Sequence, residues 1–145
     1  MKCKELMIGD WVSDKYGYLM QVTFVGNGYV SFEDNEGNLC QLDDKCNQPE
    51  PIPLTPEILE KNGWHLDTTL KEHFDSPWVY KNDKITLSLN FPSENERFAG
   101  VLGIFTEYTI RTLPGFLWQD TLYVHELQHS LRLCKLNELA DNFKV

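Results

Sequence analysis

The sequence lacks long apolar runs and is poor in basic residues. No stretch approaches the roughly 18 consecutive apolar residues that a membrane-spanning helix needs. The N-terminal segment MKCKELMIGDW is charged and contains no apolar core of signal-peptide length. Thirteen Lys and Arg stand against 22 Asp and Glu, and the resulting net charge of −9 repels phosphate backbones and anionic lipids. We therefore expect a cytoplasmic protein that binds neither nucleic acid nor a membrane.

Cysteine is also scarce, and its spacing does not indicate a metal site. The four cysteines are Cys3, Cys40, Cys46 and Cys134, and no two of them form a C-x-x-C pair. Cys40 and Cys46 are six positions apart, which is not the usual spacing of a zinc-binding loop. In a reducing compartment we expect all four to be free thiols.

The first 53 residues have the pattern of short β-strands. Two β-rich runs flank Gly17, and the Asn27-Gly28 pair that follows is a strong hairpin signal. Strands of this length and spacing are typical of a small, SH3-like β-barrel. Prolines 49, 51 and 53 then exclude a central strand and predict an extended connector or a sheet edge.

The remainder of the chain predicts helix, strands and helix in that order. Thr55 and Pro56 are suited to begin a short helix, and Gly63 to end it. Residues 76–91 predict a hairpin that turns at Asn82-Asp83, and 97–105 and 107–113 predict two further strands, with a break at 114–119. Residues 121–135 predict a final helix. The fold class is therefore α+β with a mainly antiparallel sheet, in two halves (1–53 and 54–145) that together could form one domain.

The final helix contains His125-Glu126-Leu127-Gln128-His129, which matches the H-E-x-x-H pattern of zinc metalloproteases. Residues four apart lie on one face of a helix, so His125 and His129 could share one metal ion. Glu126 could then activate a bound water as general base.

The helical positions and the missing third ligand weaken this zinc hypothesis. At about 100° per residue, an apolar stripe forms opposite the two histidines. The stripe consists of Val124, Leu127, Leu131 and Cys134. Arg132 falls on the histidine face, where it would add positive charge beside a dication. The elongated form of the motif needs a third histidine at position 135, which is Lys.

Other third ligands would have to come from His65, His73, Glu138 or Asp141. We expect Glu138 and Asp141 to lie on the same helix or its end and to point elsewhere. Nothing in the spacing of His65 and His73 places either near the motif. A metal-free helix with hydrogen-bonded or solvated histidines is the simpler interpretation, and a zinc site is the alternative.

Segments 51–64 (PIPLTPEILEKNGW) and 122–133 (LYVHELQHSLRL) together resemble small proteins from Bacteroidetes genomes, prophages and mobile elements. Those proteins typically carry ELRIGN near the start, PIPLTEEILLKLGF in the middle and YVHELQNLYFALTG near the end. The counterparts here include residues 5–10 (ELMIGD) and 123–128 (YVHELQ), whereas 130–142 departs from the pattern. In that group the residue matching His129 is usually Asn, and the one matching Glu126 can be Gln. The resemblance thus implies a phage or mobile-element setting and no catalytic residues.

Three functional hypotheses follow from the sequence. The leading one is a non-enzymatic binding or accessory module of a bacteriophage or mobile element, with a protein partner that the sequence does not identify. The first alternative is a minimal zinc-dependent hydrolase that uses His125, His129 and Glu126. The second alternative is an assembly or adaptor component that forms homo-oligomers through its C-terminal helix, since the sequence leaves the oligomeric state open.

Overall fold

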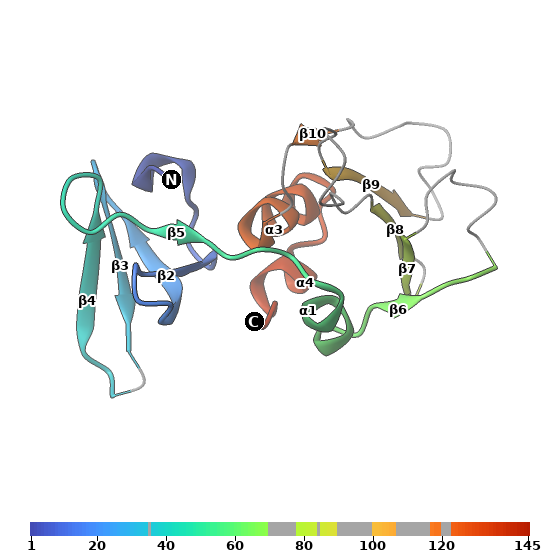
Figure 1. The fold of residues 1–145 in the computed structure, drawn as a ribbon, viewed down its shortest axis with the longest axis horizontal. Coiled ribbons are helices and arrows are strands. Elements are labelled where there is room, and N and C mark those ends of the chain that lie inside the picture. The colour runs from blue at the N-terminus through green and yellow to red at the C-terminus, as the bar shows by residue number, and fades with distance from the viewer. Residues whose placement is uncertain (35, 70–77, 84, 90–99, 107–116, 120–122) are drawn as a thin grey trace. The chain divides into compact units, whose positions relative to one another are not determined.

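The computed structural model describes residues 1–34, 36–69, 78–83, 85–89, 100–106, 117–119 and 123–145. In these residues the chain forms two antiparallel sheets and few helices, the last of them near the C-terminus (Figure 1). The α+β prediction is confirmed. The chain divides into two compact units, one of Met1–Pro53 with Tyr123–Val145 and the other of Leu54–Leu122.

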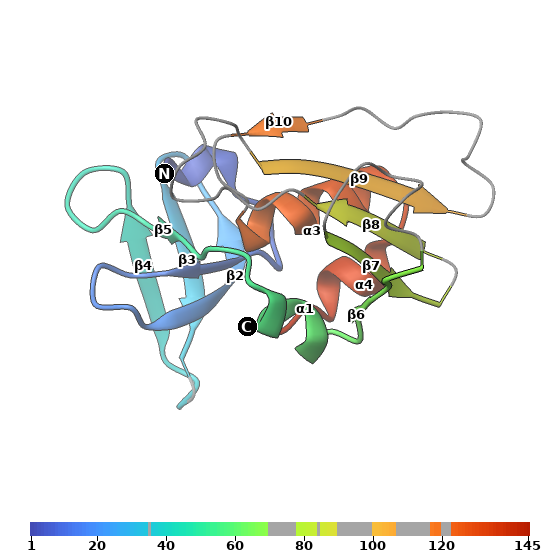
Figure 2. The ribbon, with the colours of Figure 1, turned by 45° about the vertical axis from the view of Figure 1, so that its right-hand side comes forward.

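The sheet of the first unit has the strand order β4-β3-β2-β1-β5, with every neighbouring pair antiparallel. Figures 1 and 2 show β4, β3 and β2 side by side in this sheet. Its strands are β1 (Trp11–Ser13), β2 (Leu19–Val25), β3 (Tyr29–Glu33), β4 (Leu39–Asp43) and β5 (Glu50–Pro51). Gly28, at φ +83°, turns the chain between β2 and β3 where the hairpin was predicted. The proline-rich segment supplies the edge strand β5, as expected of residues without an N–H. The pairings among the described residues close no barrel, so the SH3-like barrel stays a prediction.

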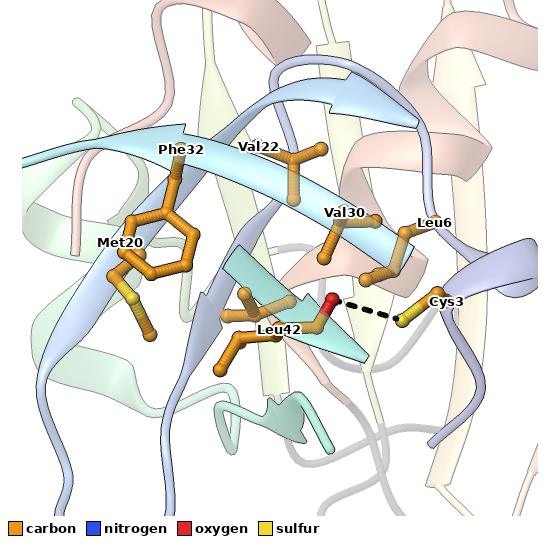
Figure 3. Close-up of a cluster of buried hydrophobic side chains, with 8 residues drawn as sticks. Cys3, Leu6, Met20, Val22, Val30, Phe32 and Leu42 are labelled. Carbon is orange, nitrogen blue, oxygen red and sulfur yellow. Dashed lines mark hydrogen bonds between the residues drawn. The ribbon is translucent and has the colours of Figure 1, made fainter. Parts of the chain in front are cut away.

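Alternate residues of these strands form a hydrophobic core together with the 3-10 helix η1 (Cys3–Glu5). Its buried members are Cys3, Leu6, Val12, Met20, Val22, Val30, Phe32 and Leu42. Figure 3 shows Met20 and Phe32 at one end of this cluster, and Cys3 and Leu6 at the other. The Cys3 thiol donates to the Leu42 carbonyl oxygen at 3.8 Å, and burial is the main cause that raises its pKa to about 11. Cys3 is therefore an unreactive core thiol.

The C-terminal helices α3 (Val124–Leu133) and α4 (Asn137–Asp141) belong to the first unit. The sequence grouped these residues with 54–122, but here the Val124 N–H donates to the Ile52 carbonyl oxygen at 2.9 Å and α3 contacts β1. Val124, Leu127 and Leu131 are fully buried, as the predicted stripe requires. Packing of that stripe, rather than proximity along the chain, decides which unit the helix joins.

The predicted single helix ends earlier than expected, because the chain turns at Lys135. This residue has φ +61° and its N–H donates to the Arg132 carbonyl oxygen, while the Leu136 N–H donates to that of Leu131. These two bonds are those of a Schellman motif, in which glycine usually occupies the left-handed position. Lys stands there instead, so the sequence carries no stop signal. Cys134, expected on the buried stripe, is the C-cap residue and is half-buried.

The second unit begins with α1 (Pro56–Lys61) and continues into the sheet β10-β9-β8-β7-β6. The Thr55 hydroxyl accepts from the Ile58 N–H at 3.4 Å, and Gly63 follows the helix at φ +79°, which confirms both predicted ends. The strands are β6 (His65–Leu66), β7 (Trp78–Asn82), β8 (Ile85–Leu89), β9 (Gly100–Thr106) and β10 (Leu117–Gln119). The predicted β7–β8 hairpin is confirmed, and β10 occurs where a break was expected. The predicted strand 107–113 lies outside the described residues.

Candidate functional site

Of the two histidines in the HELQH motif, His125 lies inside the first unit. It is 7% exposed, stacks on the Tyr123 ring at 5.9 Å between centroids, and meets the His129 ring edge-on at 5.8 Å. Burial lowers its pKa to about 4, although the Asp10 carboxylate acts in the opposite direction. His125 is therefore neutral at pH 7, and its buried Nδ1 has no hydrogen-bond partner among the described residues.

Glu126, the candidate general base, caps its own helix. One of its carboxylate oxygens accepts the Tyr123 N–H at 3.1 Å, which satisfies one of the amide donors that the first turn of a helix leaves free. Burial raises the pKa of this carboxyl. The position of Glu126 in the motif thus has a structural purpose.

His129, the second candidate ligand, is held by a carboxylate that the sequence analysis did not single out. Its Nε2 lies 2.6 Å from Oδ2 of Asp10, which is fully buried. The same Oδ2 accepts the Met7 N–H at 2.7 Å, and Oδ1 accepts from Nη1 of Arg132 at 2.6 Å. Both carboxylate oxygens are thus engaged, and Arg132 places its positive charge on the histidine face as expected.

Asp141 is also part of this cluster, contrary to the expectation that it points elsewhere. The turn at Lys135 reverses the chain, so that Oδ1 of Asp141 lies 3.2 Å from both Nε and Nη2 of Arg132. Nη2 also donates to the Ile8 carbonyl oxygen at 3.1 Å. A Cβ on Gly9, whose φ is +90°, would come within 2.9 Å of that nitrogen.

Gln128 is the second residue that the sequence analysis missed. It is fully buried: its Oε1 accepts the Trp11 N–H at 3.0 Å, and its Nε2 donates to the carbonyl oxygens of Gly9 at 2.8 Å and Ala140 at 2.9 Å. The sequence position of Gln128 could have indicated this role, because it lies one helical turn after Val124 on the buried face of the helix. A buried amide side chain needs hydrogen-bond partners there. The bonds of Gln128 to Gly9 and Trp11, together with the pair of His129 and Asp10, attach α3 to residues 7–11.

The described residues contain no group of three or more His, Cys, Asp or Glu side chains arranged to hold a metal ion. Of the candidate third ligands, His65 lies in β6 of the second unit and His73 lies outside the described residues. Glu138 is exposed on α4. The cysteines Cys40 and Cys46 are half-buried and exposed, respectively, and both are free.

A pocket of about 540 Å³ opens within the first unit, and the core residues Met20 and Phe32 contribute to its lining. Leu42 also contributes to its apolar lining. The remaining lining residues are Trp11, Asp14, Tyr18, Leu19, Gln21, Glu33, Asp34, Cys40, Gln41 and Asn47. This volume lies within the range of about 300–1,000 Å³ that is typical of ligand sites, and an apolar floor with a few polar groups is their usual lining.

Trp11 connects this pocket to the cluster around Asp10. Its backbone N–H donates to Gln128, and its indole Nε1–H donates to the Phe143 carbonyl oxygen at 2.6 Å. The C-terminal segment therefore holds one pocket wall by two hydrogen bonds. None of the sequence patterns indicated this pocket, because its lining comes from four strands and the loops between them.

Comparisons with protein-family models, curated proteins and solved structures find no match for this chain. Within the described residues, no helix is both long and apolar enough to cross a membrane.

Proposed function

We propose that this chain is a non-enzymatic binding module that receives a partner protein in the pocket of its first unit. The pocket combines an apolar floor, exposed aromatic and aliphatic side chains and hydrogen-bonding groups, a lining suited to binding. Tyr18 and Leu19 on its rim are 71% and 52% exposed. Large exposed apolar groups beside a pocket are typical of interaction sites.

The observation that carries this proposal is that the HELQH side chains form structural contacts. Glu126 caps the helix and His129 pairs with Asp10, while His125 is buried against Tyr123. A hydrolytic zinc would require Nε2 of His129 and the Glu126 carboxylate to be free for metal and water, and both are engaged, whereas Nδ1 of His125 has no partner among the described residues. The same contacts argue against the zinc hydrolase, which remains the alternative.

We also propose that the first unit is an SH3-like barrel. The strand order supports this fold, because the fifth strand returns to pair with the first, as in such a barrel. We further propose the phage or mobile-element setting, and the cytoplasm as compartment. Two of the segments that carry the resemblance, 5–10 (ELMIGD) and 123–128 (YVHELQ), meet in space, because Nε2 of Gln128 donates to the Gly9 carbonyl oxygen. The apolar stripe of α3 packs within its own unit, so we do not favour self-association through that stripe.

Selection from a library of random short peptides tests the proposal. We expect the wild-type protein to enrich peptides that a Tyr18→Ala/Leu19→Ser variant does not bind. Both side chains are exposed, so the variant should fold, and circular dichroism checks this. A Glu126→Gln variant serves as the control, because glutamine can replace glutamate in the helix cap, and it should bind the selected peptides as the wild type does.

A second measurement addresses the zinc alternative. Protein purified without a histidine tag is analysed for bound zinc and for hydrolysis of a generic protein substrate. Stoichiometric zinc, together with hydrolysis that Glu126→Gln abolishes, would establish the hydrolase and refute the proposal. Selection that yields no peptide dependent on Tyr18 and Leu19 would also refute it.

A further inference from the structure

The charged side chains that line the pocket are all acidic. Asp14, Glu33 and Asp34 contribute carboxylates, and no Lys, Arg or His belongs to the lining in the described part of the chain. Hydrogen bonds from the side chain and backbone N–H of Asn38 lower the pKa of the Asp34 carboxyl. A pocket lined by one sign of charge concentrates ligands of the opposite sign.

A hydrogen-bond acceptor in the lining also lacks a partner. The Oδ1 atom of Asn47 is buried and makes no hydrogen bond to any described residue. An unsatisfied buried acceptor is unfavourable, and this one has no accessible surface as it stands, so a ligand that brings an N–H donor would gain affinity only where the Asn47 amide turns toward the pocket. This observation is independent of the carboxylates and indicates the same kind of ligand, a donor rather than an acceptor.

The rest of the pocket suits the aliphatic part of a long cationic side chain. Met20 and Phe32, at 8% and 6% exposure, provide an apolar floor, and Trp11 and Tyr18 provide aromatic rings. Lys and Arg bury their methylene groups on apolar surfaces, and their charged ends are attracted to aromatic faces. The two hydrogen bonds that hold Trp11 preorganise this wall, which reduces the entropy lost on binding.

We propose that the pocket binds a lysine or arginine side chain presented by a partner protein, with the carboxylates of Asp14, Glu33 and Asp34 around the cationic group and Asn47 turning its amide oxygen to accept one of its N–H donors. The inference rests on the proposed function and names the chemistry of its partner. The pocket volume of about 540 Å³ also leaves room for an apolar neighbour of that residue.

The peptides selected on the wild-type protein provide the test. We expect Lys or Arg to be enriched at one position. The tightest peptide is then resynthesised with citrulline, the neutral analogue of arginine, or with glutamine in place of lysine. Fluorescence anisotropy should show that this loss of charge weakens binding about tenfold, or about 1.4 kcal/mol. Added salt should reduce the difference, because the carboxylates are near solvent.

Two variants of equal net charge separate a local effect from the overall acidity of the protein. Asp14→Asn/Glu33→Gln/Asp34→Asn removes the three pocket carboxylates, and Glu50→Gln/Glu60→Gln/Glu138→Gln removes three exposed carboxylates that do not line the pocket. Each variant changes the formal net charge from −9 to −6, because three negative charges are lost. We expect only the first variant to lose the preference for the charged peptide.

The outcomes distinguish this inference from the proposed function. Selected peptides that depend on Tyr18 and Leu19 but show no preference for Lys or Arg would overturn the inference and leave the proposed function intact. Equal loss of preference in both triple variants would also overturn it. If agmatine alone bound as tightly as the peptide, the ligand would be a small amine, and the assignment to a protein side chain would be wrong.

Discussion

Replacing Gln128 with leucine tests whether the buried amide holds α3 to the N-terminal segment. The native side chain makes three hydrogen bonds, to the Trp11 N–H and to the carbonyl oxygens of Gly9 and Ala140. After the change, Gly9 O keeps the Gln21 amide at 3.1 Å and Ala140 O keeps the Phe143 N–H at 3.4 Å. The Trp11 N–H would face a methyl group where it now meets an oxygen.

The expected loss follows from these three contacts. An orphaned buried donor costs about 1–3 kcal/mol, and each of the other two bonds contributes about 1 kcal/mol net. Leucine recovers part of this through its apolar surface, so we expect the free energy of unfolding to fall by about 3 kcal/mol. Urea unfolding followed by circular dichroism measures the change, with an unaltered m-value as the sign that both end states are comparable.

Gln48→Leu is the matched control for this substitution. Gln48 is exposed, and its amide donates to the Asp44 carbonyl oxygen at 2.7 Å. Its replacement should change the free energy of unfolding by no more than about 0.5 kcal/mol, as is usual for surface positions. If Gln128→Leu cost as little as Gln48→Leu, the role assigned to the buried amide would be refuted.

Four further substitutions test other parts of the same unit. His125 stays neutral in the folded protein down to about pH 4, whereas its ordinary pKa is 6.5, so the unfolded chain takes up a proton first and stability falls as the pH drops through this window. Asp10, His129 and Glu5 are the charged or titratable side chains that act on it. Between pH 7 and 5 the wild type should lose about 2 kcal/mol more than His125→Phe in urea unfolding, and parallel pH profiles would contradict this. Asp10→Ala should cost about 3–5 kcal/mol, because it leaves Arg132 without its buried partner. Asp141→Ala, whose side chain is 60% exposed, should cost less than about 1 kcal/mol; similar losses in the two variants would show that burial of Asp10 is not decisive. Lys135→Gly should raise the free energy of unfolding by about 0.5–1 kcal/mol, because glycine relieves the positive φ, and a lower melting temperature would argue against strain at this turn.

The contacts of the HELQH residues give a physical reason for a motif that looks catalytic. A glutamate at the third position of a helix is well placed to cap it, and the glutamine two positions later meets backbone groups of residues 9–11. His129 follows one turn after His125 and reaches Asp10. A pattern of a few fixed residues on a helix can thus arise from capping and packing alone, without metal chemistry.

Features that depend on near neighbours in the chain were predictable from the sequence. Thr55 caps α1, the turns at Asn27-Gly28 and Asn82-Asp83 join hairpins, and Val124, Leu127 and Leu131 form the buried stripe of α3. Each of these depends on residues a few positions apart, where spacing alone determines which side chains share a face.

Only the tertiary structure decided the partners of the charged and amide side chains. Asp10 and His129 are 119 positions apart, and no local pattern relates them. The turn that brings Asp141 to Arg132 is formed by Lys135, a residue without a turn signal, and is held by backbone bonds. The pocket likewise depends on which strands lie side by side. The sequence by itself determined the elements and the buried face of α3, whereas long-range packing determined where that face lies and therefore which side chains meet.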